Sequence, residues 1–581
     1  MVLVVTACNR APPPPASEAA PDSAETEAPV AIVDKPAFEL AAAAGVVRAG
    51  VASGRAALLD RPSLGSTRDE LNRLYDTATY SPLWVEVTGR PSRAARDAIA
   101  ALRTAFDDGL DTLDYGGRRL DSVVAALDAA SQLDPEEVGR FDLALSTAFL
   151  RYIRHLHNGR IDPRRLGFQL DVPIDRHDFA VLIHTALADG TVPQLVADQR
   201  PPLAVYRRVR EALARYRLLA DSVVDSAPPV KTPVKPDTDW DGVPPLIRRL
   251  RLLGDLPDSV ASAGPADSAP SDSAWRAGTL RYAEPLVSAV KRFQQRHGLT
   301  ADGVIGPATV AALNVSIARR ADQLMLTLER LRWLPDLSGG RFMVVNIPTF
   351  HLWGWDSLNP EGAPSIDMNV IVGKNALSTR TPVFAEELEY VIFRPYWNVP
   401  PGILRGEVLP ATRKDPGYLA RNDMEIVQGQ GDDARPVAVT PENMTLLTRG
   451  FLRVRQRPGP RNALGLVKFI FPNAENVYLH STPAQELFSR TRRDFSHGCV
   501  RVERPVDLAV WVLRDVPAWD RARIVAAMEK GKPTRVNLPR ALPVILFYTT
   551  AIVELDGRPG FYEDIYRHDQ RLLEALGARS E

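Results

Sequence analysis

The sequence has little cysteine, no net charge and few long apolar runs. Its 581 residues include two cysteines, so Cys499 is the only one beyond Cys8. The formal net charge is zero, which argues against a nucleic-acid-binding protein because such a protein needs a basic face. After the first residues, no stretch is long and apolar enough to span a bilayer. The sequence therefore indicates a chain of folded domains in which Cys499 is the one thiol beyond the N-terminal segment.

The chain is long enough for roughly three or four domains. Hydrophobic residues make up 45% of it, which supports large cores and excludes wholesale disorder. From near residue 60 apolar residues recur at three- and four-residue intervals, which predicts a helical scaffold domain over 60–240. From residue 341 the period changes to two and β-branched residues predominate, which predicts strands. We therefore expect a multidomain α+β protein.

The N-terminal residues 1–8 are apolar and end in Thr6-Ala7-Cys8. This segment resembles the end of a bacterial lipoprotein signal, in which the cysteine becomes lipidated; an unstructured apolar N-terminus is the alternative. Residues 9–59 begin as a polar, proline-rich run that is typical of a tether. A lipidated Cys8 predicts attachment to a membrane and leaves Cys499 without an intrachain partner. In an envelope that favours disulfides, such a free thiol is better explained by reactivity than by packing.

Residues 241–316 contain short predicted helices joined by a glycine-fixed turn. The helix Val287–Phe293 closes with Gly298 as its C′ residue, and Ala308–Leu313 forms the next helix. The pattern resembles the small three-helix peptidoglycan-binding domain, and an ordinary helical hairpin is the alternative. We expect a connecting helix over 317–340 to lead to the next domain.

Predicted strands indicate a mainly β domain over 341–581. Residues 401–455 are more polar and irregular, as expected of an inserted cap over a site. Pro505 at the start of an apolar run predicts a helix to Leu513. The predicted strands are Phe342–Ile347, Met368–Val372, Tyr390–Phe393, Val467–Phe471, Val477–His480 and Val544–Tyr548.

Cys499 follows His480 by nineteen positions and is preceded by Gly498. A thiolate is a nucleophile, and an adjacent imidazole lowers a thiol pKa from about 8.5 toward neutral. Glycine permits a sharp backbone turn, so the amides of Gly498 and Cys499 are candidates for holding a developing oxyanion. One cysteine with a distant histidine predicts a cysteine-nucleophile enzyme. A buried structural cysteine is the alternative.

Two neighbours of this pair have candidate roles. In a strand over 477–480, Tyr478 and His480 point to one face, toward a cleft or solvent. The apolar residues Val477 and Leu479 point to the other face, toward the core. Arg501 shares a face with Cys499 if the chain is extended there, so it favours the thiolate or holds a substrate carboxylate. A structural ion pair explains Arg501 equally well.

These motifs resemble the L,D-transpeptidase family with its YkuD-type catalytic domain. The order of scaffold, peptidoglycan-binding module and capped catalytic domain is similar to the large multidomain branch found in Gram-negative envelopes. The resemblance is carried by residues 344–348, 370–374, 395–400, 458–465, 478–480 and 496–501.

The resemblance implies an acyltransferase of the periplasm or cell envelope that takes part in cell-wall biogenesis and forms 3→3 peptidoglycan cross-links. Cys499 attacks the third residue of a stem peptide, forms a thioester and releases D-alanine. His480 moves the protons, and the backbone carbonyl of Ser481 completes the triad.

The remaining residues implied by the family shape the site. The partners are stem peptides and glycan, and no cofactor or metal is required. A core role is the equal alternative for the two aromatic pocket candidates. The loop residues are Ser496, His497 and Gly498, and the candidates for lining the donor pocket are Tyr478, Trp397 and Asn398.

Several alternatives remain open. Water as acceptor makes the protein an L,D-carboxypeptidase, and a protein lysine makes it an anchoring enzyme. A zinc site of His480, His497 and Cys499 is disfavoured because neither His-Glu-x-x-His nor Cys-x-x-Cys occurs. A serine acyl-enzyme built on Ser288-x-x-Lys291 is disfavoured because the motif lies in the binding module. A non-catalytic wall-binding lipoprotein is the last alternative, although the cysteine and histidine are intact.

Overall fold

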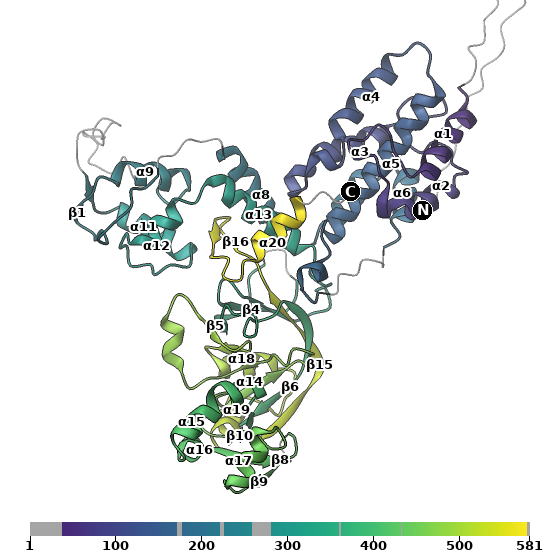
Figure 1. The fold of residues 1–581 in the computed structure, drawn as a ribbon. Coiled ribbons are helices and arrows are strands. Elements are labelled where there is room, and N and C mark those ends of the chain that lie inside the picture. Colours follow the sequence, from purple (N-terminus) through teal and green to yellow (C-terminus); the bar gives the residue numbers. More distant parts are fainter. Residues whose placement is uncertain are drawn as a thin grey trace, which may run out of the picture.

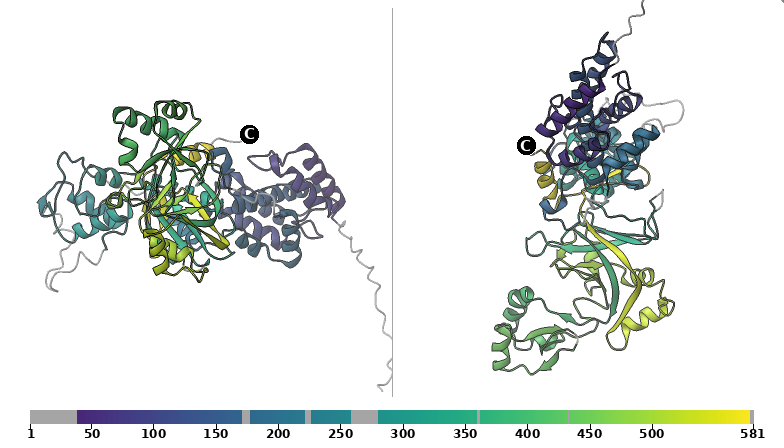
Figure 2. Two further views of the ribbon diagram at one scale, coloured as in Figure 1. Left: turned by 90° about the horizontal axis from the view of Figure 1, so that it is seen from below. Right: turned by 90° about the vertical axis from the view of Figure 1, so that its right-hand side faces the viewer.

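The molecule consists of three bodies around a central group of helices (Figure 1). A helical N-terminal domain and a small helical domain lie on opposite sides of this group, and a β-rich domain extends below it, as Figure 2 also shows. This arrangement confirms the multidomain α+β class. The computed structural model describes residues 38–170, 177–220, 226–257, 280–358, 362–431 and 433–577.

The scaffold is built around the long helix α5 (Pro135–Asn158). Asp134 is its N-cap and accepts the N–H of Glu136, while Pro135 occupies the first turn. Most of this helix is buried, because the other helices share one hydrophobic core with it. They are α1 (Leu40–Ser53), α2 (Arg68–Asp76), α3 (Arg93–Arg103), α4 (Gly117–Ala129), α6 (Phe179–Asp189) and α7 (Val192–Asp198).

Two central helices join the scaffold to the β-rich domain. Helix α8 (Ala204–Leu219) and helix α13 (Ile317–Leu331) pack together, and both contribute to the largest hydrophobic core. Leu213 of α8 and Leu324 of α13 lie in the same core as Val345 of the sheet. A continuous apolar core therefore connects these parts of the chain. The connecting helix expected over 317–340 ends at Leu331.

The small helical domain has its own core. Phe293, Leu246 and Leu313 come from three different helices and are buried together, so a simple helical hairpin does not describe it. Gly298 has φ +64°, the conformation expected of a C′ residue. The elements are α9 (Val243–Leu252), α11 (Leu286–Arg296) and α12 (Pro307–Leu313), with a strand pair β1 (Thr238–Asp239) and β2 (Arg281–Tyr282).

The β-rich domain is built on a nine-stranded sheet of order β13-β5-β14-β12-β11-β6-β15-β3-β4, and a further pairing of β4 with β5 closes it into a barrel. The six predicted strands fall in this sheet, although the one predicted over 477–480 is limited to two residues. The strands are β3 (Phe342–Asn346), β4 (His351–Trp355), β5 (Ile366–Gly373), β6 (Phe384–Phe393), β11 (Val467–Ile470), β12 (Leu479–His480), β13 (Asp494–Ser496), β14 (Val500–Val502) and β15 (Thr534–Phe547).

The elements that complete this domain follow β14 and β15. The helix predicted from Pro505 is present and ends at Val512. These elements are α18 (Pro505–Val512), α19 (Arg521–Glu529), β16 (Ala551–Val553), β17 (Pro559–Phe561) and α20 (His568–Gly577).

The segment predicted as an irregular cap is an ordered subdomain at the far end of the β-rich domain from the scaffold (Figure 1). Val408, Ile426 and Val454 belong to its own core. Its helices and strands are too short to show a regular spacing of apolar residues, so the sequence predicts irregular structure for this segment. They are β7 (Trp397–Asn398), α14 (Pro401–Ile403), α15 (Leu409–Lys414), α16 (Tyr418–Arg421), β8 (Met424–Gln428), β9 (Arg435–Val437), α17 (Pro441–Thr448) and β10 (Arg453–Gln456).

Candidate active site

Cys499 lies in a short loop between strands β13 and β14. Ser496 fixes this loop, because its hydroxyl donates to the Cys499 carbonyl at 2.5 Å and accepts the Gly498 N–H at 3.1 Å. Gly498 has φ +122°, a conformation that a side chain would strain. The Gly498 N–H is therefore already paired, so of the two amides proposed from the sequence for an oxyanion, that of Cys499 is the better candidate.

His480 lies on the neighbouring strand. Strands β12 and β14 are parallel, with Leu479 opposite Val500 and His480 opposite Arg501. The Nδ1 of His480 lies 2.5 Å from the carbonyl oxygen of Ser481. Since a carbonyl only accepts, Nδ1 carries the hydrogen and Nε2 is left as the acceptor. This is the tautomer that a general base requires.

The environment of His480 differs from the sequence prediction of a side chain facing a cleft or solvent. Its exposed fraction is 4%. Burial, assisted by the nearby cations Arg501 and Lys468, lowers the pKa of His480 to about 3. The imidazole is therefore neutral at physiological pH.

The pKa of the Cys499 thiol also differs from the prediction. Burial raises this pKa above its ordinary value, although hydrogen bonds from Tyr478 and the charges of Lys468 and Arg501 act in the opposite direction. The thiol donates to the carbonyl of Asn476 at 3.8 Å. The Cys499 thiol and the His480 imidazole are thus both neutral at rest and are not a preformed thiolate–imidazolium pair.

Two cations flank His480 in the sheet. Lys468 of β11 is the register partner of His480, and Arg501 of β14 is its partner on the other side, so the three side chains share one face. Arg501 is half-buried and its Nε has no hydrogen-bond partner. The ion pairs found among the described residues do not include one between Arg501 and a carboxylate.

The other predicted residues occupy different positions. Tyr478 is half-buried, its ring lies 5.8 Å from that of His480, and the Lys468 ammonium lies 3.7 Å from its centroid. Trp397 and Asn398 form β7 in the cap sheet, where Trp397 packs against the cap core and Asn398 is exposed. The core alternative therefore describes the packing of Trp397.

His497 connects the loop to the cap. Its Nε2 lies 2.8 Å from Oε1 of Glu407, which belongs to a helical turn of the cap, Leu404–Val408. Both side chains are exposed. The cap therefore touches the loop of Cys499 directly.

Three residues near this loop were not predicted. Thr381 donates its hydroxyl to the Gly498 carbonyl at 2.7 Å, and its own N–H is received by the hydroxyl of Tyr566 at 3.2 Å. Lys468 is the third. No sequence signal identifies them, because Thr381 and Tyr566 lie far from the His–Cys motif in the chain and Lys468 is a single polar residue in the predicted strand Val467–Phe471.

Other candidate features lie elsewhere. Cys8 falls outside the described residues. Ser288 and Lys291 both lie on α11 of the small helical domain. In the part of the chain that the structure describes, no helix has the length and apolar character needed to cross a bilayer, and no three metal-ligating side chains gather.

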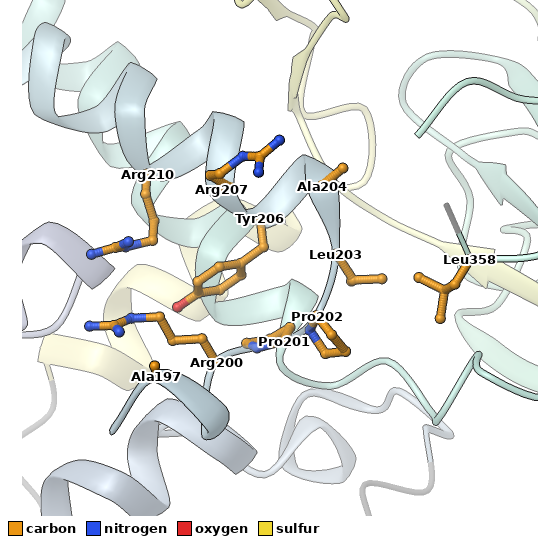
Figure 3. Close-up of a pocket in the computed structure, with 10 residues that line it drawn as sticks. All are labelled: Ala197, Arg200, Pro201, Pro202, Leu203, Ala204, Tyr206, Arg207, Arg210 and Leu358. Carbon is orange, nitrogen blue, oxygen red and sulfur yellow. The ribbon is translucent and has the colours of Figure 1, made fainter. Parts of the chain in front are cut away.

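A separate cavity of about 500 Å³ lies between the scaffold side and the β-rich domain (Figure 3). Tyr206 and Leu203 of the α8 region line it, with Leu358 on the opposite side. Of the arginines that line it, Arg200 and Arg210 are both paired with Asp108. None of the predicted site residues lines this cavity.

Comparison with known proteins identifies three segments. Residues 69–213 match the "Scaffold domain", residues 274–313 the "Putative peptidoglycan binding domain" and residues 340–536 the "L,D-transpeptidase catalytic domain". Over 250 residues the chain is 34% identical to a Haemophilus influenzae protein described as "Putative L,D-transpeptidase". This match covers 43% of the chain and 48% of that protein, so the chain spans about half the length of the curated relative. The resemblance inferred from the sequence is confirmed: the chain carries an L,D-transpeptidase catalytic domain preceded by a scaffold domain and a peptidoglycan-binding domain.

Proposed function

We propose that this protein is an L,D-transpeptidase that forms 3→3 peptidoglycan cross-links through a Cys499 thioester. The observation that carries the proposal is the position of His480. Its Nδ1 is held by the Ser481 carbonyl, and its strand lies directly beside the one that follows Cys499. Because the Ser481 carbonyl engages Nδ1, Nε2 of His480 is left as the proton acceptor for Cys499 in this proposal.

In the first half-reaction, the sulfur of Cys499 attacks the carbonyl carbon of the third residue of a donor stem. The thiol proton passes to Nε2 of His480, and the Cys499 N–H stabilises the oxyanion. The bond to the terminal D-alanine then breaks, and its amine takes the proton from His480. The products are a thioester and free D-alanine.

In the second half-reaction, the side-chain amine of a second stem attacks the thioester. His480 accepts a proton from that amine, the carbon–sulfur bond breaks, and the proton returns to the sulfur. The new amide is the cross-link. Water in place of the amine gives an L,D-carboxypeptidase, and a protein lysine gives an anchoring enzyme.

Lys468 and Arg501 are proposed to receive a carboxylate of the donor stem. They flank His480 on one face of the sheet, and Arg501 has an unpaired Nε. A bound carboxylate offsets the two charges that help to lower the pKa of His480. His480 then becomes a stronger base when the donor is bound.

The proposed setting is the periplasmic cell wall. The match to a peptidoglycan-binding domain supports stem peptides and glycan as partners. Lipidation at Cys8, which is outside the described residues, would tether the enzyme to a membrane through the proline-rich run that follows.

The test is intact mass spectrometry after exposure of the purified chain to a carbapenem, a β-lactam acylating agent. We expect one covalent adduct that maps to Cys499 and is absent from Cys499→Ala. An adduct on Ser288, or none, contradicts the proposal.

A second assay identifies the acceptor. Incubation with a tetrapeptide stem should release D-alanine and give a cross-linked dimer. Tripeptide alone indicates a carboxypeptidase, and no turnover indicates the non-catalytic wall-binding alternative. Cys499→Ala is the control for both products.

A further inference from the structure

A C-terminal segment beyond the matched catalytic domain reaches the loop of Cys499. This segment, called the strap, comprises residues 548–569 and contains β16 and β17. The matched L,D-transpeptidase domain ends at residue 536, so the strap lies outside it.

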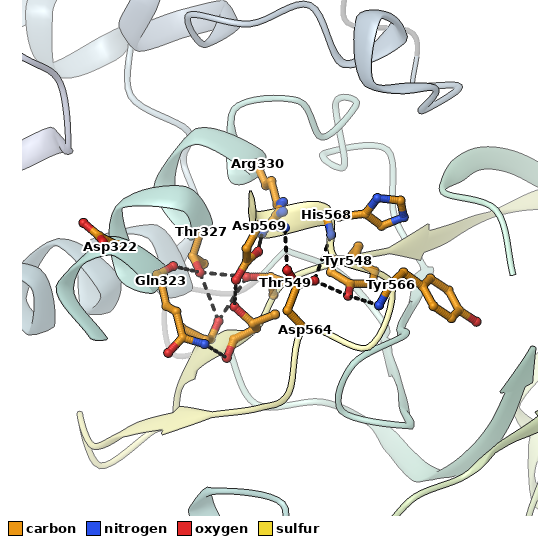
Figure 4. A network of polar contacts seen from close by, with 12 residues as sticks. Asp322, Gln323, Thr327, Arg330, Tyr548, Thr549, Asp564, Tyr566, His568 and Asp569 are labelled. Atoms are coloured by element: carbon orange, nitrogen blue, oxygen red, sulfur yellow. Dashed lines mark hydrogen bonds and ion pairs between the residues drawn. The ribbon is translucent and has the colours of Figure 1, made fainter. Parts of the chain in front are cut away.

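The strap is fixed by a buried polar network (Figure 4). Asp569 pairs with Arg330 of α13 at 2.5 Å, and both side chains are 1% exposed. The hydroxyl of Tyr548 donates to Asp564 at 2.6 Å and accepts the Tyr566 N–H at 2.9 Å. The strap is therefore held rigidly against the central helices.

The strap also contacts the small helical domain. Nη1 of Arg296 donates to the carbonyl of Pro559 at 2.6 Å, and the ring of His297 lies 5.8 Å from that of Phe561. These contacts hold the β16–β17 hairpin against the small helical domain.

The hydroxyl of Tyr566 lies at the outer end of its side chain, away from the buried network (Figure 4). This hydroxyl donates to the carbonyl of Gly373 at 2.5 Å and accepts the N–H of Thr381 at 3.2 Å. Burial raises the pKa of Tyr566 to about 12, so the hydroxyl remains a donor at physiological pH.

Both partners of this hydroxyl touch the loop of Cys499. Gly373 is the register partner of Ser496, at the start of the loop. Thr381 donates to the carbonyl of Gly498, the residue before Cys499, and accepts the N–H of Gly373 at 2.8 Å. One phenol thus fixes the loop at two points.

We propose that Tyr566 is a positioning residue for Cys499, acting through Thr381 and Gly373. It sets the direction of the thiol relative to His480 without touching the substrate. This inference rests on the proposed function for its acylation measurement, but the alkylation measurement below is independent of that function.

The physical reason is the precision that acyl transfer requires. A reacting atom displaced by about 1 Å can cost about a hundredfold in rate, even when the change lies away from the chemistry. Alkylation by a small reagent needs no alignment with His480, so loosening the loop should expose the half-buried thiol and speed that reaction.

The experiment compares Tyr566→Phe, Thr381→Val and the control Tyr562→Phe in the full chain. Tyr562 lies in the same strap, but its ring faces Gly298 of the small helical domain. For each variant, the rate of carbapenem acylation and the rate of iodoacetamide alkylation of Cys499 are followed by intact mass. Thermal melting establishes that each variant is folded.

We expect Tyr566→Phe and Thr381→Val to slow acylation by about tenfold to a hundredfold and to speed alkylation by about threefold. The double variant should be no slower in acylation than the slower single variant, since both act on one path. Tyr562→Phe should match the unsubstituted protein in both rates.

Three results would overturn the inference. They are equal acylation in Tyr566→Phe and Tyr562→Phe, a parallel fall in both rates with a lower melting temperature, or unchanged alkylation in Tyr566→Phe. If the unsubstituted protein is not acylated at all, the proposed function fails, and the alkylation comparison still decides the role of Tyr566.

Discussion

The Nδ1 of His480 lies 2.5 Å from the carbonyl oxygen of Ser481, the residue that follows it in the chain. This contact fixes both the orientation of the ring and the position of its hydrogen. A backbone carbonyl carries no formal charge, so it orients the imidazole without adding an anion to the site. Combined with burial, this leaves a neutral base in the resting protein.

The first prediction concerns pH. Since burial lowers the pKa of His480 to about 3, the imidazole does not become protonated as pH falls through its ordinary value. The second-order rate of acylation, which reports the free protein, should therefore show no loss with a midpoint near the usual histidine pKa of about 6.5. It should rise at alkaline pH, because the pKa of Cys499 is raised. A midpoint at the ordinary histidine value would show that His480 titrates normally.

The second prediction concerns the donor carboxylate. Removing the charge of Arg501 or Lys468 (Arg501→Gln, Lys468→Met) should raise KM for a tetrapeptide donor by about tenfold or more, as expected for loss of a charge-assisted hydrogen bond. Steady-state kinetics measures the change. Arg535→Gln is the matched control, because Arg535 lies on the same sheet but stacks on Tyr390. An unchanged KM in both variants would exclude the carboxylate role.

The third prediction concerns contact between the cap and the loop. Glu407→Ala removes the partner of His497. Because both groups are exposed, this pair stabilises the contact between the cap and the loop by about 1 kcal/mol at most. Alkylation of Cys499 should therefore become faster by about fivefold at most. Glu442→Ala, an exposed change elsewhere in the cap on α17, is the control and should leave the rate unchanged.

The fourth prediction concerns stability. Asp569→Ala leaves Arg330 buried without its carboxylate partner, which should lower the free energy of unfolding by about 3–5 kcal/mol. Glu574→Ala on the exposed side of α20 should change it by less than about 0.5 kcal/mol. Chemical denaturation of the full chain, followed by intrinsic fluorescence, compares the two. Equal changes in the free energy of unfolding for the two variants would mean that the Arg330–Asp569 pair adds no specific stability.

Local signals in the sequence were informative where neighbours along the chain decide the structure. Asp134 and Pro135 predict the start of α5, and Gly298 predicts the end of α11. The change from helical to alternating period separates the scaffold from the sheet. Each of these features depends on residues within about one turn of helix or a few strand positions, which a sequence displays directly.

The structure of the cap and the pKa values of the site could not be predicted from such local signals. The core of the cap is assembled from short elements whose apolar residues, such as Val408 and Ile426, show no common period. The sequence also predicted a lowered thiol pKa, whereas burial raises it. Burial depends on everything packed around the thiol, and that is a property of the fold.

The amino-acid sequence by itself determined the order of the domains and the histidine and cysteine on which the proposed chemistry depends, because these are marked by composition and by short motifs. Only the tertiary structure decided what surrounds them. Lys468, Arg501 and His480 meet through the register of three strands, and Tyr566 reaches Gly373 from a segment almost 200 residues away. Such contacts depend on how the sheet closes, which no local pattern records.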